Sequence, residues 1–122
     1  TIKNYNVNSV IIVLNNQGYG LIKQTQETWL KSVYAGTDKS SGLSLPNNVK
    51  IASSYGIKSF ILKNNDDVKK NIKKILNSKG PILVDVLIDP KSRVKPKIEY
   101  GKPLENMYPY IDKSKLKEIM KK

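Results

Sequence analysis

Three short apolar runs constrain what this chain can fold into. They cover Val10–Leu14, Ile57–Leu62 and Ile82–Ile88; the second is interrupted by Lys58 and Ser59, and Asp85 is the one polar residue within the third. Continuous runs of β-branched and aliphatic residues, such as the first and the third, are typical of strands covered on both faces of a parallel sheet. Helical spacing of apolar residues between the runs indicates right-handed crossovers between parallel strands.

The segments between these runs predict three helices. The first covers Leu21–Tyr34, where apolar residues recur at mixed helical spacing. The second has Pro46 in its first turn and stops at Gly56. The third is expected to begin at a cap formed by Asn65 or Asp66, because the apolar residues after it fall at i, i+4, i+7 and i+8.

The last third of the chain has a different character. Residues 89–110 contain four prolines and little periodicity, which indicates a segment that wraps over a surface. Asp112 is expected to cap a last short helix, with three apolar residues facing inward: Leu116, Ile119 and Met120. We therefore predict an α/β core over residues 1–89, and a tail with a short helix over residues 90–122.

The predicted fold is a three-layer sandwich with a parallel sheet, and it is incomplete. Three strands are few for such a sheet, because covering both faces of Ile82–Ile88 requires more neighbouring elements than this chain supplies. We expect either that further strands precede Thr1 in the native protein or that a partner covers the exposed edge.

The composition excludes several classes of site. The chain has no cysteine and no histidine, so disulfides, thiolate metal sites and histidine bases are absent, and a reducing cytoplasm is the expected compartment. Its longest apolar run, Val10–Leu14, is far shorter than the roughly 20 residues of a membrane span. No membrane association is expected.

The net charge of +12 leaves two interpretations open, a solvated lysine-rich surface and a basic patch for nucleic acid. Arg93 is the single arginine, whereas specific recognition of phosphates and bases relies on the bidentate guanidinium. The scattered lysines therefore favour the solvated surface and no nucleic-acid partner, with salt-dependent adsorption to anions.

Two carboxamides, Asn15 and Asn16, follow the first apolar run and precede Gly18 and Gly20. In open parallel sheets, ligands bind beyond the carboxyl ends of the strands. A carboxamide oxygen is a hard, neutral ligand that suits Mg²⁺ or Ca²⁺, and glycines let backbone groups approach an ion or a phosphate. The alternative is an ordinary turn after a strand, in which Asn and Gly are common.

Four segments extend this pattern over nearly the whole chain, in order: VIIVLNNQGYGLIKQTQETW, YAGTD, SGLSLPNNVKIASSYGIK and KGPILVDVLIDP. Together they resemble thiamine-diphosphate-dependent enzymes of the acetolactate synthase type. The match is to the later part of their C-terminal cofactor-binding domain, which includes the second half of the family's Gly-Asp-Gly…Asn-Asn signature. The closing GKPLENMYPYID is similar to the tails of related proteins.

This resemblance implies thiamine diphosphate and Mg²⁺ as cofactors. Asn16 would ligate Mg²⁺ through its side-chain oxygen, and Gly18 through its backbone carbonyl. The diphosphate and the thiazolium ring would lie along the next three residues: Tyr19, Gly20 and Leu21. For Leu21 the alternative is packing in the core, whereas Asn15 is expected to hold the turn by hydrogen bonds.

The resemblance also implies the reaction of a parent enzyme, a transferase or lyase that decarboxylates a 2-keto acid and joins the remaining fragment to an acceptor. That enzyme would be a homodimer or homotetramer with its active site between subunits, and Trp29 and Tyr34 are expected in the core or at a subunit contact. The Gly-Asp-Gly half is expected before Thr1, and the glutamate that activates the cofactor in another domain. The isolated chain is therefore expected to hold no catalytic residue and to be inactive.

Two alternatives belong to other functional classes. One is a non-catalytic α/β binding or protein-interaction domain that keeps the fold and has lost the site. The other is a lysine-rich nucleic-acid binder, which predicts a basic stripe with stacking aromatic residues and a steep loss of affinity with salt. The retained Asn-Asn-x-Gly disfavours the first alternative, and the scattered tyrosines disfavour the second.

Overall fold

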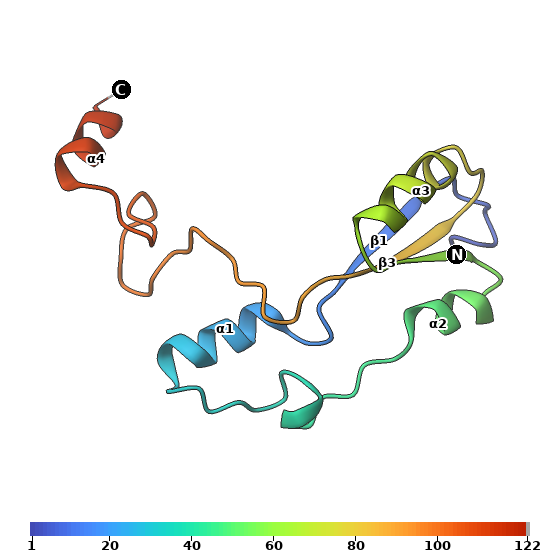
Figure 1. The fold of residues 1–122 in the computed structure, drawn as a ribbon, viewed down its shortest axis with the longest axis horizontal. Coiled ribbons are helices and arrows are strands. Elements are labelled where there is room, and N and C mark those ends of the chain that lie inside the picture. The colour runs from blue at the N-terminus through green and yellow to red at the C-terminus, as the bar shows by residue number, and fades with distance from the viewer. Residues whose placement is uncertain (122) are drawn as a thin grey trace. The chain divides into compact units, whose positions relative to one another are not determined.

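The structure is a computed structural model and describes residues 1–121. The chain divides into two compact units, of which the first is Thr1–Ser92 and the second begins at Arg93. The helices and strands of the first unit (Figure 1) are β1 (Val10–Asn15), α1 (Gly20–Trp29), the short 3-10 helix η1 (Lys39–Ser41), α2 (Asn48–Ser54), β2 (Lys58–Leu62), α3 (Asn65–Leu76) and β3 (Ile82–Leu87).

The three strands form one parallel sheet in the order β1-β3-β2. Ile82 of the central strand is in register with Val10 on one side and with Lys58 on the other. Because side chains alternate along each strand, Ile82 and Val84 lie on one face of the sheet and Asp85 lies on the other. Helix α3 packs on the first face and α2 lies against the second, which confirms the predicted α/β sandwich.

The core lies between α3 and the face of β2 and β3 that carries Ile82. Four side chains in it are buried with almost no water contact: Leu62, Ile75, Ile82 and Val84. Three partly buried residues pack against them: Phe60, Val68 and Val86. Removing this apolar surface from water is the main stabilising term of the unit.

The residue that caps α3 differs by one position from the prediction. We expected Asn65 or Asp66, but the cap is Asn64, whose side-chain oxygen accepts a hydrogen bond of 2.9 Å from the backbone N–H of Asp67. That amide is at the third helical position, which is the one that a cap side chain reaches. Acidic residues in the first turn and lysines in the last turn complement the helix dipole.

Helix α3 packs on one face of β2 and β3, and β1 is uncovered on that face of the sheet. Ile12 and Leu14 are 59% and 66% exposed, although they share that face with the buried Val84. The expectation that this strand is covered on both faces is therefore wrong within this unit, because α3 packs over β2 and β3. The expectation of an incomplete sandwich is confirmed.

Two helices of the first unit are shorter than predicted. Helix α1 ends at Trp29 instead of Tyr34, because Lys31 and Ser32 adopt left-handed φ angles of 50° and 60°. Pro46 precedes α2 instead of lying in its first turn, since the side chain of Asn47 accepts a 2.9 Å hydrogen bond from the N–H of Lys50 and so caps the helix.

The second unit contains α4 (Lys113–Met120). Asp112 caps this helix, as predicted, and accepts hydrogen bonds from the backbone of Ser114 and Lys115. Ile119 and Met120 are exposed within the unit, so the prediction that they face inward is wrong. No helix in residues 1–121 has the length and apolar content to cross a membrane.

Adjacent residues of α3 provide a test of the core. Ile75 is 2% exposed and Leu76 is 65% exposed. We expect Ile75→Ala to lower the free energy of unfolding of the chain by about 2–5 kcal/mol, because it leaves a cavity among Leu62, Ile82 and Val84. The matched control, Leu76→Ala, is expected to change it by no more than about 0.5 kcal/mol. Urea unfolding followed by circular dichroism measures both, and equal losses would contradict this assignment of the core.

Candidate functional site

The candidate site is the turn of residues 15–20, which joins the end of β1 to the start of α1. Asn15 is in register with Leu87 of β3, so the turn leaves the carboxyl edge of the sheet, where open parallel sheets bind ligands. A groove of about 930 Å³ runs along this edge. A smaller pocket of about 220 Å³ lies between the turn and residues 37–40.

Asn15 holds this turn with both ends of its carboxamide. Its Oδ1 accepts a 3.0 Å hydrogen bond from the N–H of Gln17, and its Nδ2 donates a 3.2 Å hydrogen bond to Asp85. The first of these bonds secures Gln17, which has a left-handed φ of 60°. The prediction that Asn15 holds the turn by hydrogen bonds is confirmed.

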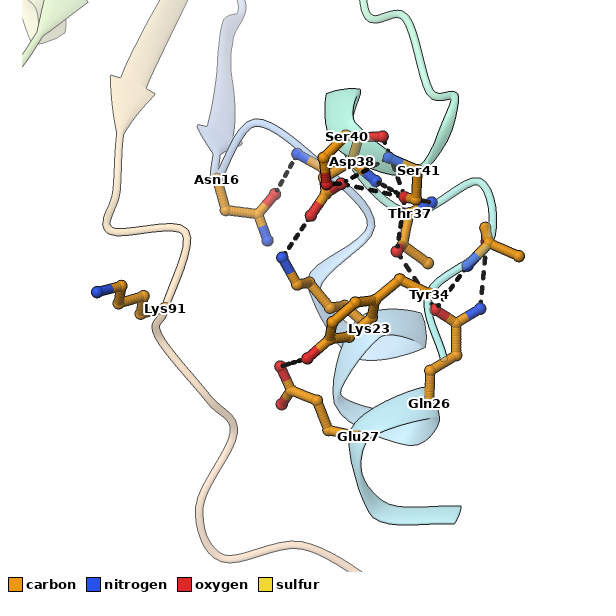
Figure 2. A network of polar contacts seen from close by, with 12 residues as sticks. Asn16, Lys23, Gln26, Glu27, Tyr34, Thr37, Asp38, Ser40, Ser41 and Lys91 are labelled. Atoms are coloured by element: carbon orange, nitrogen blue, oxygen red, sulfur yellow. Dashed lines mark hydrogen bonds and ion pairs between the residues drawn. The ribbon is translucent and has the colours of Figure 1, made fainter. Parts of the chain in front are cut away.

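Asn16 is oriented by the two glycines that follow it. Its Oδ1 accepts a 3.3 Å hydrogen bond from the N–H of Gly18 (Figure 2). Its amide nitrogen lies against Gly20, where an added Cβ would come within 2.3 Å of that nitrogen. Glycine at position 20 is therefore required for the orientation that the Asn16 side chain has here.

The loop of residues 35–43 lies directly against the turn. Gly18 pairs with Asp38 as in an antiparallel ladder, and the N–H of Tyr19 donates a 2.8 Å hydrogen bond to the carbonyl of Thr37. A Cβ at Gly18 would lie 2.4 Å from that same carbonyl oxygen. The close approach of the two backbones thus depends on glycine at position 18.

An ion pair joins this loop to α1. Lys23 Nζ pairs with the carboxylate of Asp38 (Figure 2) and lies 4.9 Å from the centre of the Tyr34 ring. The hydrogen bond from Lys23, followed by those from Ser40 and Ser41, holds the pKa of Asp38 well below its usual range.

Gln26 anchors the start of the loop. Its buried side chain donates to the carbonyl of Ala35 at 3.1 Å and accepts from the Ala35 N–H at 3.4 Å and the Thr37 hydroxyl at 3.3 Å. The sequence indicated the Gln24-Thr25-Gln26 segment only through the family resemblance. The partners of Gln26 in the loop were not predicted, and neither was the pair of Lys23 with Asp38.

Four of the five predicted cofactor-binding residues line the smaller pocket: Asn16, Gly18, Tyr19 and Gly20. The fifth, Leu21, is exposed, so the alternative that it packs in a core is wrong within this unit. Trp29 and Tyr34 are also exposed, which corrects the expectation of a core position and leaves a subunit contact as a prediction.

The donor groups of the turn suit Mg²⁺ in chemical type. Within residues 1–121 no group of three or more His, Cys, Asp or Glu side chains could hold a metal ion. The ligands that the family resemblance predicts are the Asn16 carboxamide oxygen and the Gly18 carbonyl. Both are hard, neutral oxygens, and Asn16 Oδ1 keeps a lone pair beyond the one used by the Gly18 N–H. Mg²⁺ is commonly held by few protein ligands together with phosphate oxygens and water.

Comparison with known proteins shows which family this chain resembles. The family model described as "Thiamine pyrophosphate enzyme, C-terminal TPP binding domain" matches residues 1–86. The mitochondrial acetolactate synthase of Schizosaccharomyces pombe is 33% identical over 104 residues, which cover 85% of this chain and 15% of that protein. The acetolactate synthase large subunit of Cyanidium caldarium is 31% identical over 107 residues, which cover 88% of this chain and 18% of the relative.

A third relative matches nearly the whole length of the chain. The probable acetolactate synthase large subunit of Methanocaldococcus jannaschii is 32% identical over 130 aligned residues, which cover 99% of this chain and 21% of that protein. The chain thus spans about a fifth or less of the length of these curated relatives.

The ion pair of Asp38 predicts how the attachment of the loop depends on pH. Because the pKa of Asp38 is lowered in the folded chain, its charged form contributes stability above the ordinary aspartate pKa of about 3.9, and this contribution is lost as the pH falls further toward the folded pKa. We expect Asp38→Asn to lower Tm by a constant amount at neutral and mildly acidic pH, and by less below about pH 4.

Thermal unfolding of wild type and variant over this pH range measures the difference. The matched control is Asp66→Asn, which alters an exposed ion pair on α3 and is expected to leave Tm almost unchanged. A difference for Asp38→Asn that stays constant down to about pH 3 would contradict the assignment.

Proposed function

We propose a function for this chain from its family: it belongs to the C-terminal TPP-binding domains of thiamine pyrophosphate enzymes. Within that family it is acetolactate synthase-like. Its role is to bind Mg²⁺ and the diphosphate of thiamine diphosphate at the turn of residues 15–20, in an enzyme that acts on a 2-keto acid.

The observation that supports this proposal most directly is the arrangement of the turn. Asn16 and Gly18 line one small pocket at the carboxyl edge of the sheet, and each offers an oxygen of the kind that Mg²⁺ binds. Helix α1 begins at Gly20, so its N-terminal N–H groups and its dipole favour a negatively charged diphosphate there.

The chain binds and orients the cofactor, and other parts of the enzyme complete the site. Asn16 and Gly18 would hold the metal ion, while Tyr19, Gly20 and Leu21 would lie along the cofactor. Thiamine diphosphate supplies the chemistry for breaking and forming carbon–carbon bonds next to the carbonyl of a 2-keto acid, as a transferase or lyase. None of the five residues is assigned a catalytic role.

We also propose that this chain is one portion of a longer, homodimeric or homotetrameric enzyme. The region shared with this chain covers only 15–21% of the length of the relatives named above. The uncovered apolar face of β1, with Ile12 and Leu14, supports a position beside further elements of the same enzyme. Those parts would supply an aspartate ligand to Mg²⁺ and the activating glutamate, so the chain by itself would be inactive.

Replacing Asn16 tests the proposed metal site. In the full-length enzyme, Asn16→Ala removes the carboxamide oxygen, and we expect it to weaken Mg²⁺-dependent binding of thiamine diphosphate by about 100-fold or more. The matched control, Asn65→Ala, alters an exposed residue at the start of α3 and is expected to leave binding unchanged. Isothermal titration of the cofactor at fixed Mg²⁺ measures both, and an unchanged dissociation constant for Asn16→Ala would refute the ligand assignment.

A further inference from the structure

Asp85 is the only charged residue among the buried residues of the described chain. It lies on the central strand β3, on the face opposite the apolar core, and is 6% exposed. A carboxylate removed from water is strongly destabilising unless hydrogen bonds satisfy it. Its partners therefore indicate why an acidic residue is tolerated within an apolar strand.

The two oxygens of this carboxylate bind two different elements. Oδ2 accepts a 3.2 Å hydrogen bond from Asn15 Nδ2 at the end of β1. Oδ1 accepts a 3.3 Å hydrogen bond from Asn48 Nδ2 at the first residue of α2. Asp85, Asn15 and Asn48 all line the groove at the carboxyl edge of the sheet, so one buried group joins both sides of this groove.

The hydrogen bonds on either side of Asn15 have a fixed direction. The N–H of Gln17 can only donate, so it requires the oxygen of the Asn15 carboxamide, at 3.0 Å. The amide nitrogen of Asn15 must then face β3 and needs an acceptor there. An ionised carboxylate is an acceptor at both oxygens, so Asp85 selects this orientation of Asn15 and disfavours the flipped one.

We propose that Asp85 is a positioning residue for the metal-binding turn, and that it acts through Asn15 on the backbone of Gln17. Gln17 lies between Asn16 and Gly18, and it keeps a left-handed φ of 60° while Asn15 Oδ1 holds its N–H. The inference rests on the proposed function, because its consequence is the placement of the two proposed Mg²⁺ ligands. It assigns to Asp85 the pre-organisation of the turn and no contact with metal or cofactor.

Exchanging the two residues tests the direction of these bonds. In the full-length enzyme, Asp85→Asn leaves a single acceptor oxygen for the two amide donors of Asn15 and Asn48, so one of them faces an amide N–H. Asn15→Asp puts two carboxylates opposite each other. Each single variant is expected to weaken Mg²⁺-dependent binding of thiamine diphosphate by about tenfold or more. The double variant exchanges donor and acceptor, so the acceptors for Gln17 and Asn48 are kept, and its affinity is expected to return close to the wild-type value.

A second measurement does not need the cofactor. Hydrogen–deuterium exchange of the cofactor-free enzyme, followed in peptides that cover residues 15–20, is expected to be faster in both single variants and to return to the wild-type rate in the double variant. The control, Asp66→Asn on the exposed side of α3, carries the same chemical change and is expected to alter neither exchange nor affinity.

The outcomes separate this inference from the proposed function. If Asn16→Ala weakens binding but neither Asp85→Asn nor Asn15→Asp does, the positioning role is refuted and the metal site stands. If Asn16→Ala has no effect, the metal site is refuted, and the exchange rates alone decide whether Asp85 orders the turn. If Asp85→Asn does not fold, the double variant decides, because a folded double variant with weak binding and fast exchange overturns the proposal.

Discussion

The pairing of β1 with β3 is the constraint on which the rest of the site depends. It sets Asn15 diagonally across from Asp85 on the same face of the sheet, two positions along the register. A slip of one residue would turn one of the two side chains to the opposite face. The hydrogen bond between Asn15 and Asp85 therefore depends on the observed register. So does the orientation of Asn15 in which its oxygen accepts from the Gln17 N–H.

The turn is therefore held from two sides by different kinds of interaction. On the sheet side, the buried carboxylate of Asp85 accepts a hydrogen bond from the Asn15 side chain, and that side chain accepts one from the backbone N–H of Gln17. On the other side, the loop of residues 35–43 binds the backbone of Gly18 and Tyr19, and Lys23 and Gln26 of α1 secure that loop. A turn with both sides fixed suits a metal ion whose ligand geometry is strict.

The same sheet explains why this chain is suited to one part of a larger site. Its core is built on β2, β3 and α3, and the outer strand β1 presents an apolar face without cover from α3. The strand that carries the proposed metal-binding turn is thus also the strand with an uncovered apolar face. In the proposed enzyme, the elements that cover β1 would stand next to the turn, where the remaining ligand is required.

The local sequence pattern was enough to predict much of this protein, because periodicity and helix capping act over a few residues. It predicted the three strands, the helices between them, the cap at Asp112 and the polar turn after β1. Tertiary structure alone decided which distant partners hold the turn and the loop beside it. Asn15 and Asp85 are 70 residues apart in the chain, and Lys23 and Asp38 meet only when the loop folds back on α1. Such pairs depend on register and loop path, which leave no periodic signal in the sequence.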